Sequence, residues 1–463
     1  MSAVRPETRD VAVLGAGPAG VAAAVGLARL GYSIHLFAGP LRVGIEGASE
    51  RTLQSLQRLG LKSAADCMRV RGPRARHWAG VESINGTEFL LDRMQFDRAL
   101  RRDAAAAGIA VREAWVSACD TLDDRWVVQT MGQPAAAFRA VIDARGRGTR
   151  GAAGTRSAAH GPALLALTQR FSSDTHEPGT AIVMGKERWC WFAQDGRGNL
   201  DMQMVCAPVR AGSRAALHSL LTADADLPPR FAAHLRSATP VGDVRARASG
   251  AYLRKAAENP GQILAGDAAM ALDPLSGHGI YEALASADLS VAALNTYLQG
   301  EDWSPVRRFV HERAQELWSR KAAAAQSFYQ SAAAASDGAF WAAMTRGYAE
   351  LAANGGMLHD PRTQIQSRPV LDGVRIAMRR VLVAPRWPRG IWRYGDIDIA
   401  QLLDCCEPGD CDAQRVASRL QRPAAAVQAA LQWLSVQGAL PVGGASGSTR
   451  TDPTGAPMAR SST

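Results

Sequence analysis

Lysine is scarce in this chain of 463 residues: four lysines stand among 53 basic side chains, so arginine carries nearly all of the positive charge. The arginines are spread out without a long basic run, which argues against nucleic-acid binding despite the net charge of +10. Long apolar runs are missing too, since no stretch approaches the ~18 consecutive apolar residues of a membrane span. The N-terminal MSAVRPETRD lacks the apolar core of a signal peptide, so we expect a cytoplasmic protein.

Cysteines are few and lack the spacing of a metal site. The seven are scattered, and only Cys405, Cys406 and Cys411 cluster, with no histidine or second cysteine pair after them. We therefore expect no bound metal and interpret the thiols as reduced structural side chains.

What the sequence does contain is the pattern of a dinucleotide-binding βαβ unit. An apolar strand, DVAVL, runs into GAGPAG, and a helix and a second strand, SIHLF, follow. The glycines permit a tight turn and a close approach to a pyrophosphate, which the helix N-terminus attracts. The residues expected to contact the dinucleotide are Gly15, Gly17, Pro18, Ala19 and Gly20. The usual ribose-binding acid is missing, because SIHLF runs into Ala38, so backbone groups or Arg42 must replace it.

A second glycine-rich entrance to a helix occurs much later, in GDAAMALDPLSGHGIYEAL. An NAD-binding fold has no need of it, whereas FAD extends past its pyrophosphate into a ribityl chain and an isoalloxazine ring. Asp267 can accept a hydrogen bond from a ribityl hydroxyl, and Gly277 and Gly279 let the backbone approach the ring. The helix beginning near Ile280 directs its positive end at the ring and would stabilise the anionic reduced flavin.

Four motifs occur in the order found in one group of flavoproteins: G-x-G-x-x-G, D-R-x-x-F-D, A-x-G-R and G-D-A…D-P-x-S-G-x-G. Over residues 10–300 the chain resembles the group that includes p-hydroxybenzoate hydroxylase, geranylgeranyl reductases and flavin-dependent halogenases. Within it, VGIEGASERTL and DPLSGHGIYEALASA are most similar to the flavoproteins of tryptophylquinone biogenesis, as in quinohemoprotein amine dehydrogenase maturation. A halogenase is disfavoured, because Val21 rather than tryptophan follows Gly20 and Trp191 is followed by Phe192-Ala193 rather than I-P.

The resemblance implies FAD as cofactor and a monooxygenase that hydroxylates a tryptophan of a polypeptide through a flavin C4a-hydroperoxide. Its partners would be a small quinoprotein subunit or precursor, molecular oxygen and an external reductant such as NAD(P)H. The alternatives are an aromatic hydroxylase or geranylgeranyl-type reductase for a small or lipid substrate, and a flavoprotein chaperone.

The resemblance also adds Arg93 and Glu46 to the cofactor-binding residues and places Pro274 beside the flavin ring. Asp273 and His278 belong to the same loop and are candidates for proton transfer. For Asp273 a turn-forming hydrogen bond, and for His278 a capping role in the loop, remain open.

We predict an α/β protein with a Rossmann-like FAD-binding domain, an inserted antiparallel sheet as substrate domain, and a small helical C-terminal module. Trp189 and Trp191 are two residues apart on one strand of that sheet, so their side chains point to the same face. Both could face the flavin ring, or pack in the core. The last helix of the module has no basic residue, which disfavours DNA binding and leaves peptide recognition or structural capping. The expected boundaries are 1–155 and 250–300 for the FAD-binding domain, 156–249 for the substrate domain, 301–395 for a helical region, 396–440 for a winged-helix-like module and 441–463 for a disordered tail.

Overall fold

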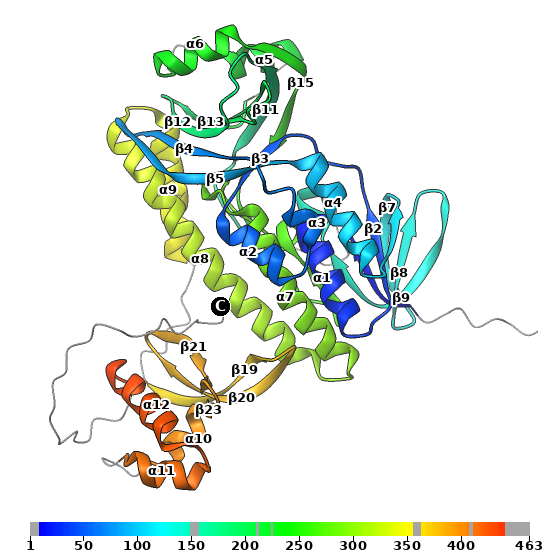
Figure 1. Ribbon diagram of the computed structural model, residues 1–463, viewed down its shortest axis with the longest axis vertical. Coiled ribbons are helices and arrows are strands. Elements are labelled where there is room, and N and C mark those ends of the chain that lie inside the picture. The colour runs from blue at the N-terminus through cyan, green and yellow to red at the C-terminus, as the bar shows by residue number, and fades with distance from the viewer. Residues whose placement is uncertain are drawn as a thin grey trace, which may run out of the picture. The chain divides into compact units, whose positions relative to one another are not determined.

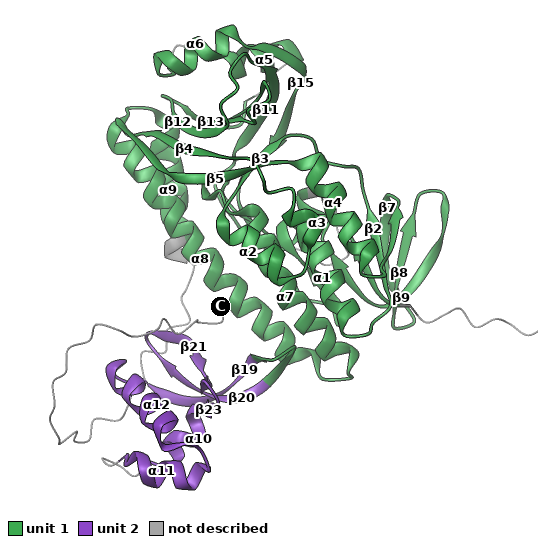
Figure 2. Cartoon of the chain, in the orientation of Figure 1, with its two compact units in different colours: residues 1–357, 371–377 green, residues 358–370, 378–463 purple. Residues whose placement is uncertain are grey.

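The computed structural model describes residues 9–148, 157–209, 213–223, 226–354, 363–406 and 411–439. The chain divides into two compact units, unit 1 with residues 1–357 and 371–377, and unit 2 with residues 358–370 and 378–463 (Figure 2). The tail expected to be disordered lies outside the described residues. Among the helices of the described ranges, none combines the length and the apolar character needed to cross a membrane.

A seven-stranded sheet forms the first layer of unit 1. Five strands are parallel in the order β6-β2-β1-β9-β17, and β7 and β8 continue from β9 as an antiparallel meander. The α/β class and Rossmann-like pattern predicted from the sequence are therefore confirmed. The strands are β1 (Arg9–Leu14), β2 (Ile34–Ala38), β6 (Ala110–Glu113), β7 (Val116–Leu122), β8 (Arg125–Thr130), β9 (Gln133–Asp143) and β17 (Gln262–Leu264).

The two faces of this sheet are covered differently, as the alternation along β1 shows. Val11 and Val13 belong to the helical core cluster, whereas Ala12 and Leu14 pack with side chains of β7, β8 and β9. All four are fully buried, which explains why the strand reads as a continuous apolar run. The helices of the first face are α1 (Pro18–Arg29), α2 (Glu50–Arg58), α3 (Lys62–Ala65), α4 (Arg93–Ala106) and α7 (Gly279–Leu298).

An eight-stranded sheet forms the second layer, in the order β15-β11-β14-β13-β12-β4-β5-β3 (Figure 1). Five strands come from the segment expected to be the substrate domain, but three come from the N-terminal part, which the sequence assigned to the FAD-binding domain. These three strands belong to the sheet because β4 pairs in parallel with β12. The sequence did not indicate this pairing, since many residues of β4 and β5 are exposed. The strands are β3 (Ile45–Ala48), β4 (Arg71–Trp78), β5 (Val81–Asp92), β11 (Leu165–Ser172), β12 (Gly179–Met184), β13 (Arg188–Gln194), β14 (Asn199–Cys206) and β15 (Thr239–Ala248).

Helices pack on both faces of the eight-stranded sheet. One face carries α5 (Arg214–Thr222) and α6 (Pro229–Ser237), which complete one apolar cluster with it. The other face carries α8 (Trp303–Ala335) and α9 (Ala339–Asn354) over Trp78 and Trp189 (Figure 1). These two helices lie in the first part of the segment expected to be helical, residues 301–395.

Short elements connect the two large sheets. A three-stranded sheet contains β10 (Ser157–His160), β16 (Tyr252–Arg254) and β18 (Met270–Ala271). Three single turns of 3-10 helix lie in the loops that carry the flavoprotein motifs, and they are η1 (Gly146–Gly148), η2 (Gly266–Ala268) and η3 (Pro274–Ser276).

The C-terminal part differs from the prediction in one respect. The C-terminal module contains helices as expected, but residues 364–391, which the sequence assigned to the helical region, form three strands. The short, fully buried run Val381–Val383, with two β-branched residues, favours a strand over a helix. The elements are β19 (Gln364–Asp372), β20 (Arg375–Ala384), β21 (Trp387–Ile391), β22 (Arg393–Tyr394), β23 (Ile397–Asp398), α10 (Ile399–Asp404), α11 (Ala413–Leu420) and α12 (Ala424–Val436).

The close packing of α1 on α7 generates a first prediction. A Cβ atom at Gly26 would lie 2.6 Å from Cγ2 of Val291, whose β-branched side chain has little rotamer freedom in a helix. Overpacking costs ~1–3 kcal/mol, against ~1 kcal/mol gained from alanine in a helix. We expect Gly26→Ala to lower the free energy of unfolding by ~1 kcal/mol in urea, and to be neutral or stabilising in a Val291→Ala background. Equal losses in both backgrounds would show that this contact does not limit the packing.

Candidate cofactor-binding site

The turn between β1 and α1 has the geometry expected of a phosphate-binding loop. A side chain at Gly15, where φ is +111°, would meet the carbonyl oxygen of Ala144, and one at Gly20 would meet the carbonyl oxygen of Gly15. Gly17 differs, because a Cβ atom there would have nothing within 4 Å. Gly17 is the N-cap of α1, so the open position lies at the N-terminus of the helix, whose first-turn N–H groups have no partner within the helix.

The second glycine-rich motif lies directly beside the first. Gly266 has a φ of +58°, and a Cβ atom on it would lie 2.9 Å from the Cβ of Ala19 in α1. Its N–H donates to Oγ of Ser286 at 2.9 Å, which ties η2 to α7. The adjacent Asp267 keeps its side chain 35% exposed. Two segments far apart in the sequence thus form one continuous wall.

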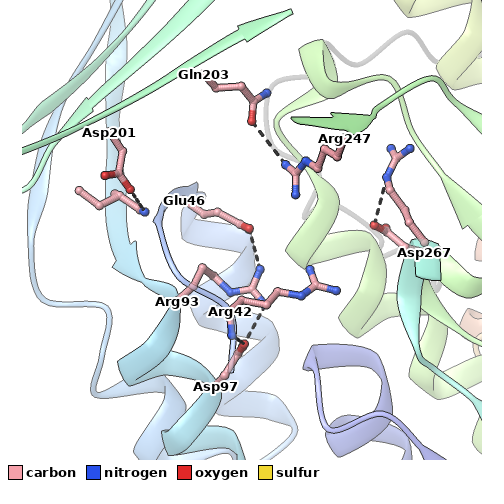
Figure 3. A network of polar contacts seen from close by, with 10 residues as sticks. Arg42, Glu46, Arg93, Asp97, Asp201, Gln203, Arg247 and Asp267 are labelled. Atoms are coloured by element: carbon pink, nitrogen blue, oxygen red, sulfur yellow. Dashed lines mark hydrogen bonds and ion pairs between the residues drawn. The ribbon is translucent and has the colours of Figure 1, made fainter. Parts of the chain in front are cut away.

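A buried ion-pair network is centred on Arg93 (Figure 3). Arg93 is 3% exposed and donates from Nη1 to Oε1 of Glu46 at 2.7 Å and from Nη2 to Oδ1 of Asp97 at 2.9 Å. Asp97 also accepts from the backbone N–H of Arg42 at 3.4 Å. Each Nη atom of Arg93 therefore donates to one carboxylate, and Arg93 fixes Glu46 and Asp97 relative to each other.

Charged side chains from four different segments converge in front of this network (Figure 3). Arg42, Glu46, Arg247 and Asp267 point toward a common space, and Nε of Arg147 lies 3.7 Å from Oδ2 of Asp267. The partial enclosure of this space lowers the pKa of Arg247, and repulsion from Arg147 and Arg42 adds to the effect. Such a cluster favours an anionic ligand.

Glu46 titrates differently because its neighbours are cationic. Burial by itself raises the pKa of Glu46, but the positive charges of Arg93 and Arg42 outweigh burial and bring the pKa below its ordinary value. Glu46 is therefore an anion at neutral pH and can accept hydrogen bonds.

The loop of η3 is held from below by two tyrosines. Asp273, 5% exposed, accepts at Oδ2 from Tyr348 Oη at 2.6 Å and from Tyr329 Oη at 3.1 Å, and at Oδ1 from the N–H of Leu275 at 2.9 Å. The last contact is the turn-forming hydrogen bond considered for Asp273. Burial nevertheless raises the pKa of the carboxyl group, although these hydrogen bonds counteract it.

The same loop continues from η3 into the N-terminus of α7. Pro274 opens η3, and Gly277 ends it with a φ of +61°, which favours glycine. His278 is the N-cap of α7, but its side chain does not bond to the helix; Nδ1 instead contacts the carbonyl oxygen of Ser276. Burial lowers the pKa of His278, and Lys321 and Arg74 lower it further, so the ring is neutral at neutral pH with Nε2 as an acceptor.

The first turn of α7 ends this wall of the site. Gly279 offers open space where a Cβ would be, and Ile280 is 7% exposed, with its side chain in the helical core. The backbone of this turn, rather than the side chain of Ile280, therefore faces the candidate site.

The two tryptophans of β13 differ in burial, although they are two residues apart on the strand. Trp189 is 2% exposed within the apolar cluster under α8 and α9, as the packing alternative predicts. Trp191 is partly buried and remains the one of this pair that could line a ligand site. The sequence did not single out Arg247 on β15, nor the pairing of Tyr329 and Tyr348 with Asp273, because nothing local marks these long-range contacts.

Comparison with solved structures shows which proteins the chain is similar to. No protein-family model and no curated protein matches the sequence. Among solved structures, the chain is similar to the peptidyl tryptophan dihydroxylase QhpG, essential for tryptophylquinone cofactor biogenesis, with a TM-score of 0.79 and 28% identity over 93% of this chain and 99% of that one. It is also similar to the flavin-dependent halogenase CmlS, with a TM-score of 0.68 and 18% identity over 94% of this chain and 96% of that one.

A third similarity, to the myxobacterial FAD-dependent halogenase CndH, has a TM-score of 0.61 and 20% identity over 77% of this chain and 92% of that one. The chain therefore has the fold of flavin-dependent halogenases and hydroxylases. The flavoprotein resemblance that the four motifs indicated is confirmed, including its similarity to a tryptophan-hydroxylating member.

Asp273 provides a second prediction, based on pH. A carboxyl group whose pKa is raised in the folded state holds its proton longer there, so stability falls as pH rises from its unfolded pKa through its folded pKa. We expect Asp273→Asn to remove this part of the pH dependence in urea denaturation between pH ~4 and pH ~8. The exposed control Asp337→Asn, at a side chain 85% exposed, should retain the slope of the original protein. Identical slopes in all three proteins would contradict the burial cost assigned to Asp273.

Proposed function

We propose that the protein is an FAD-dependent monooxygenase that hydroxylates a tryptophan side chain within a polypeptide, as a step in tryptophylquinone biogenesis. The observation that carries this proposal is the similarity to QhpG, which extends over nearly the whole of both chains. The shared region includes part of unit 2, since it exceeds the residues of unit 1.

The residues of the site fit FAD along its whole length. Gly17 and the N-terminus of α1 offer backbone N–H groups to the pyrophosphate, and Arg42 and Arg247 add positive charge. Asp267 is placed to accept from a ribityl hydroxyl. The N-terminus of α7, beginning at Gly279, favours negative charge on the ring. When bound and reduced, FAD supplies the activation of molecular oxygen.

The protein side chains position the substrate ring and handle protons. His278, neutral with Nε2 unprotonated, can accept a proton released by the ring. Asp273 positions Pro274 and the loop through its two tyrosine partners. In the overall reaction a ring C–H bond becomes C–OH, one atom of O₂ enters the ring, and the other leaves as water with two electrons from an external reductant such as NAD(P)H and two protons.

The direct test uses the purified protein, reductant, isotopically labelled oxygen gas and a small quinoprotein subunit precursor. We expect a flavin absorbance spectrum, and mass spectrometry should find the label of one or two oxygen atoms on a tryptophan of the polypeptide. Label in a free aromatic compound but not in the polypeptide would favour a small-molecule hydroxylase. Binding of the polypeptide without any labelled product would favour a chaperone.

The glycine loop gives a third prediction with a matched pair of variants. Gly17→Ala should keep the fold, because its Cβ meets nothing within 4 Å, but should weaken FAD retention by crowding the pyrophosphate. Gly20→Ala should destabilise the protein itself, because its Cβ would collide with the carbonyl oxygen of Gly15. Thermal unfolding of the FAD-free protein and flavin content after gel filtration separate the two effects. Full flavin retention by Gly17→Ala would rule out this phosphate site.

A further inference from the structure

We propose that a cavity between α8 and the loop of η3 receives the aromatic ring of the substrate tryptophan. This inference deepens the proposed function and depends on it for the identity of the substrate. The cavity measures about 130 Å³ and lies in unit 1, with Asp273, Ser276 and His278 of the candidate site in its wall. It therefore adjoins the loop that resembles the flavin-ring loop of related enzymes.

The size and apolar wall of the cavity suit one planar ring system. An apolar cavity of ~150 Å³ accommodates a benzene-sized guest, so a volume of about 130 Å³ is on the scale of one small aromatic ring and is too small for a long prenyl chain. This argues against the lipid-reductase alternative. The apolar residues of the wall are Leu272, Leu275, Trp318, Ala322, Ala325 and Phe328.

Hydrogen-bond acceptors line the same cavity, which favours an indole over a plain hydrocarbon. A buried indole N–H needs an acceptor. Nδ1 of His278 contacts the carbonyl oxygen of Ser276 and so carries the proton of the neutral ring, which leaves Nε2 as an acceptor. The carboxylate of Asp273 is fixed by Tyr348 on the opposite helix.

The charged groups around the cavity are suited to a substrate that enters as a side chain. Lys321, in the wall, is paired with Glu282 of α7 at 2.7 Å. Phe328, 40% exposed, has the guanidinium of Arg76 at 5.6 Å from its ring centre. A polypeptide can leave its polar backbone among such groups while one apolar ring enters the cavity.

Two neighbouring alanines of α8 make the inference testable. Both Ala323 and Ala324 are exposed, but only Ala324 contributes to the cavity wall. Phenylalanine at either position has the same cost in helix propensity, so the two variants should be equally stable. We expect Ala324→Phe to obstruct the cavity and Ala323→Phe to leave it open.

The probe is a fluorinated N-acetyl-tryptophanamide, whose binding to the FAD-loaded protein is followed by fluorine NMR line broadening. Ala324→Phe should weaken binding at least ~10-fold, whereas Ala323→Phe should match the original protein. Labelled-oxygen incorporation into the polypeptide should fall in parallel. Equal binding by both variants, or no binding by the original protein, would overturn the cavity assignment. Binding in the cavity without hydroxylation of any polypeptide would instead refute the proposed function alone.

Discussion

The junction of the two large sheets depends on one buried guanidinium, that of Arg93. Arg93 begins α4, which covers the seven-stranded sheet, and its partner Glu46 belongs to β3 at the edge of the eight-stranded sheet. Burial alone would lower the pKa of Arg93, but Glu46 and Asp97 raise it above its usual range, so the charge is retained. Removing one partner of such a pair costs ~3–5 kcal/mol, because the remaining charge stays buried. The position of Glu46 in the candidate cofactor site is thus tied to the assembly of both layers.

The location of the candidate cofactor site also follows from where the parallel strands end. Gly15 follows β1, Arg147 follows β9 and Gly266 follows β17, and these strands are neighbours with a common direction. Their carboxyl ends therefore bring the three loops to one edge of the sheet, where α/β proteins bind ligands. The three motifs are distant in the sequence, yet a single topological rule gathers them around one ligand.

The sequence predicts those parts of the site that rest on local geometry. The glycines at residues 15–20 and the turn at Gly277 need a particular backbone conformation. This requirement restricts the residue type, so the motif can be recognised in the sequence. Contacts between distant segments leave no such mark. Tyr348 and Tyr329 contact Asp273, which lies 75 and 56 residues away in the sequence. The sequence of the helices that carry these tyrosines is equally typical of ordinary core packing. The recruitment of β4 and β5 into the second sheet was missed for the same reason, since strand pairing is set by the partner strand.

The arginine-rich composition acquires a physical meaning from these contacts. A guanidinium can bind two carboxylates at once and stay charged when buried, as Arg93 does, and lysine offers neither property to the same degree. The more accessible arginines serve differently. In the candidate cofactor site, burial lowers the pKa of Arg247 most, and repulsion from Arg147 and Arg42 lowers it further, while Glu46 and Asp267 compensate this only in part. An anionic pyrophosphate would relieve this repulsion, so part of the energy that holds the cofactor is prepared in the folded protein before the cofactor arrives.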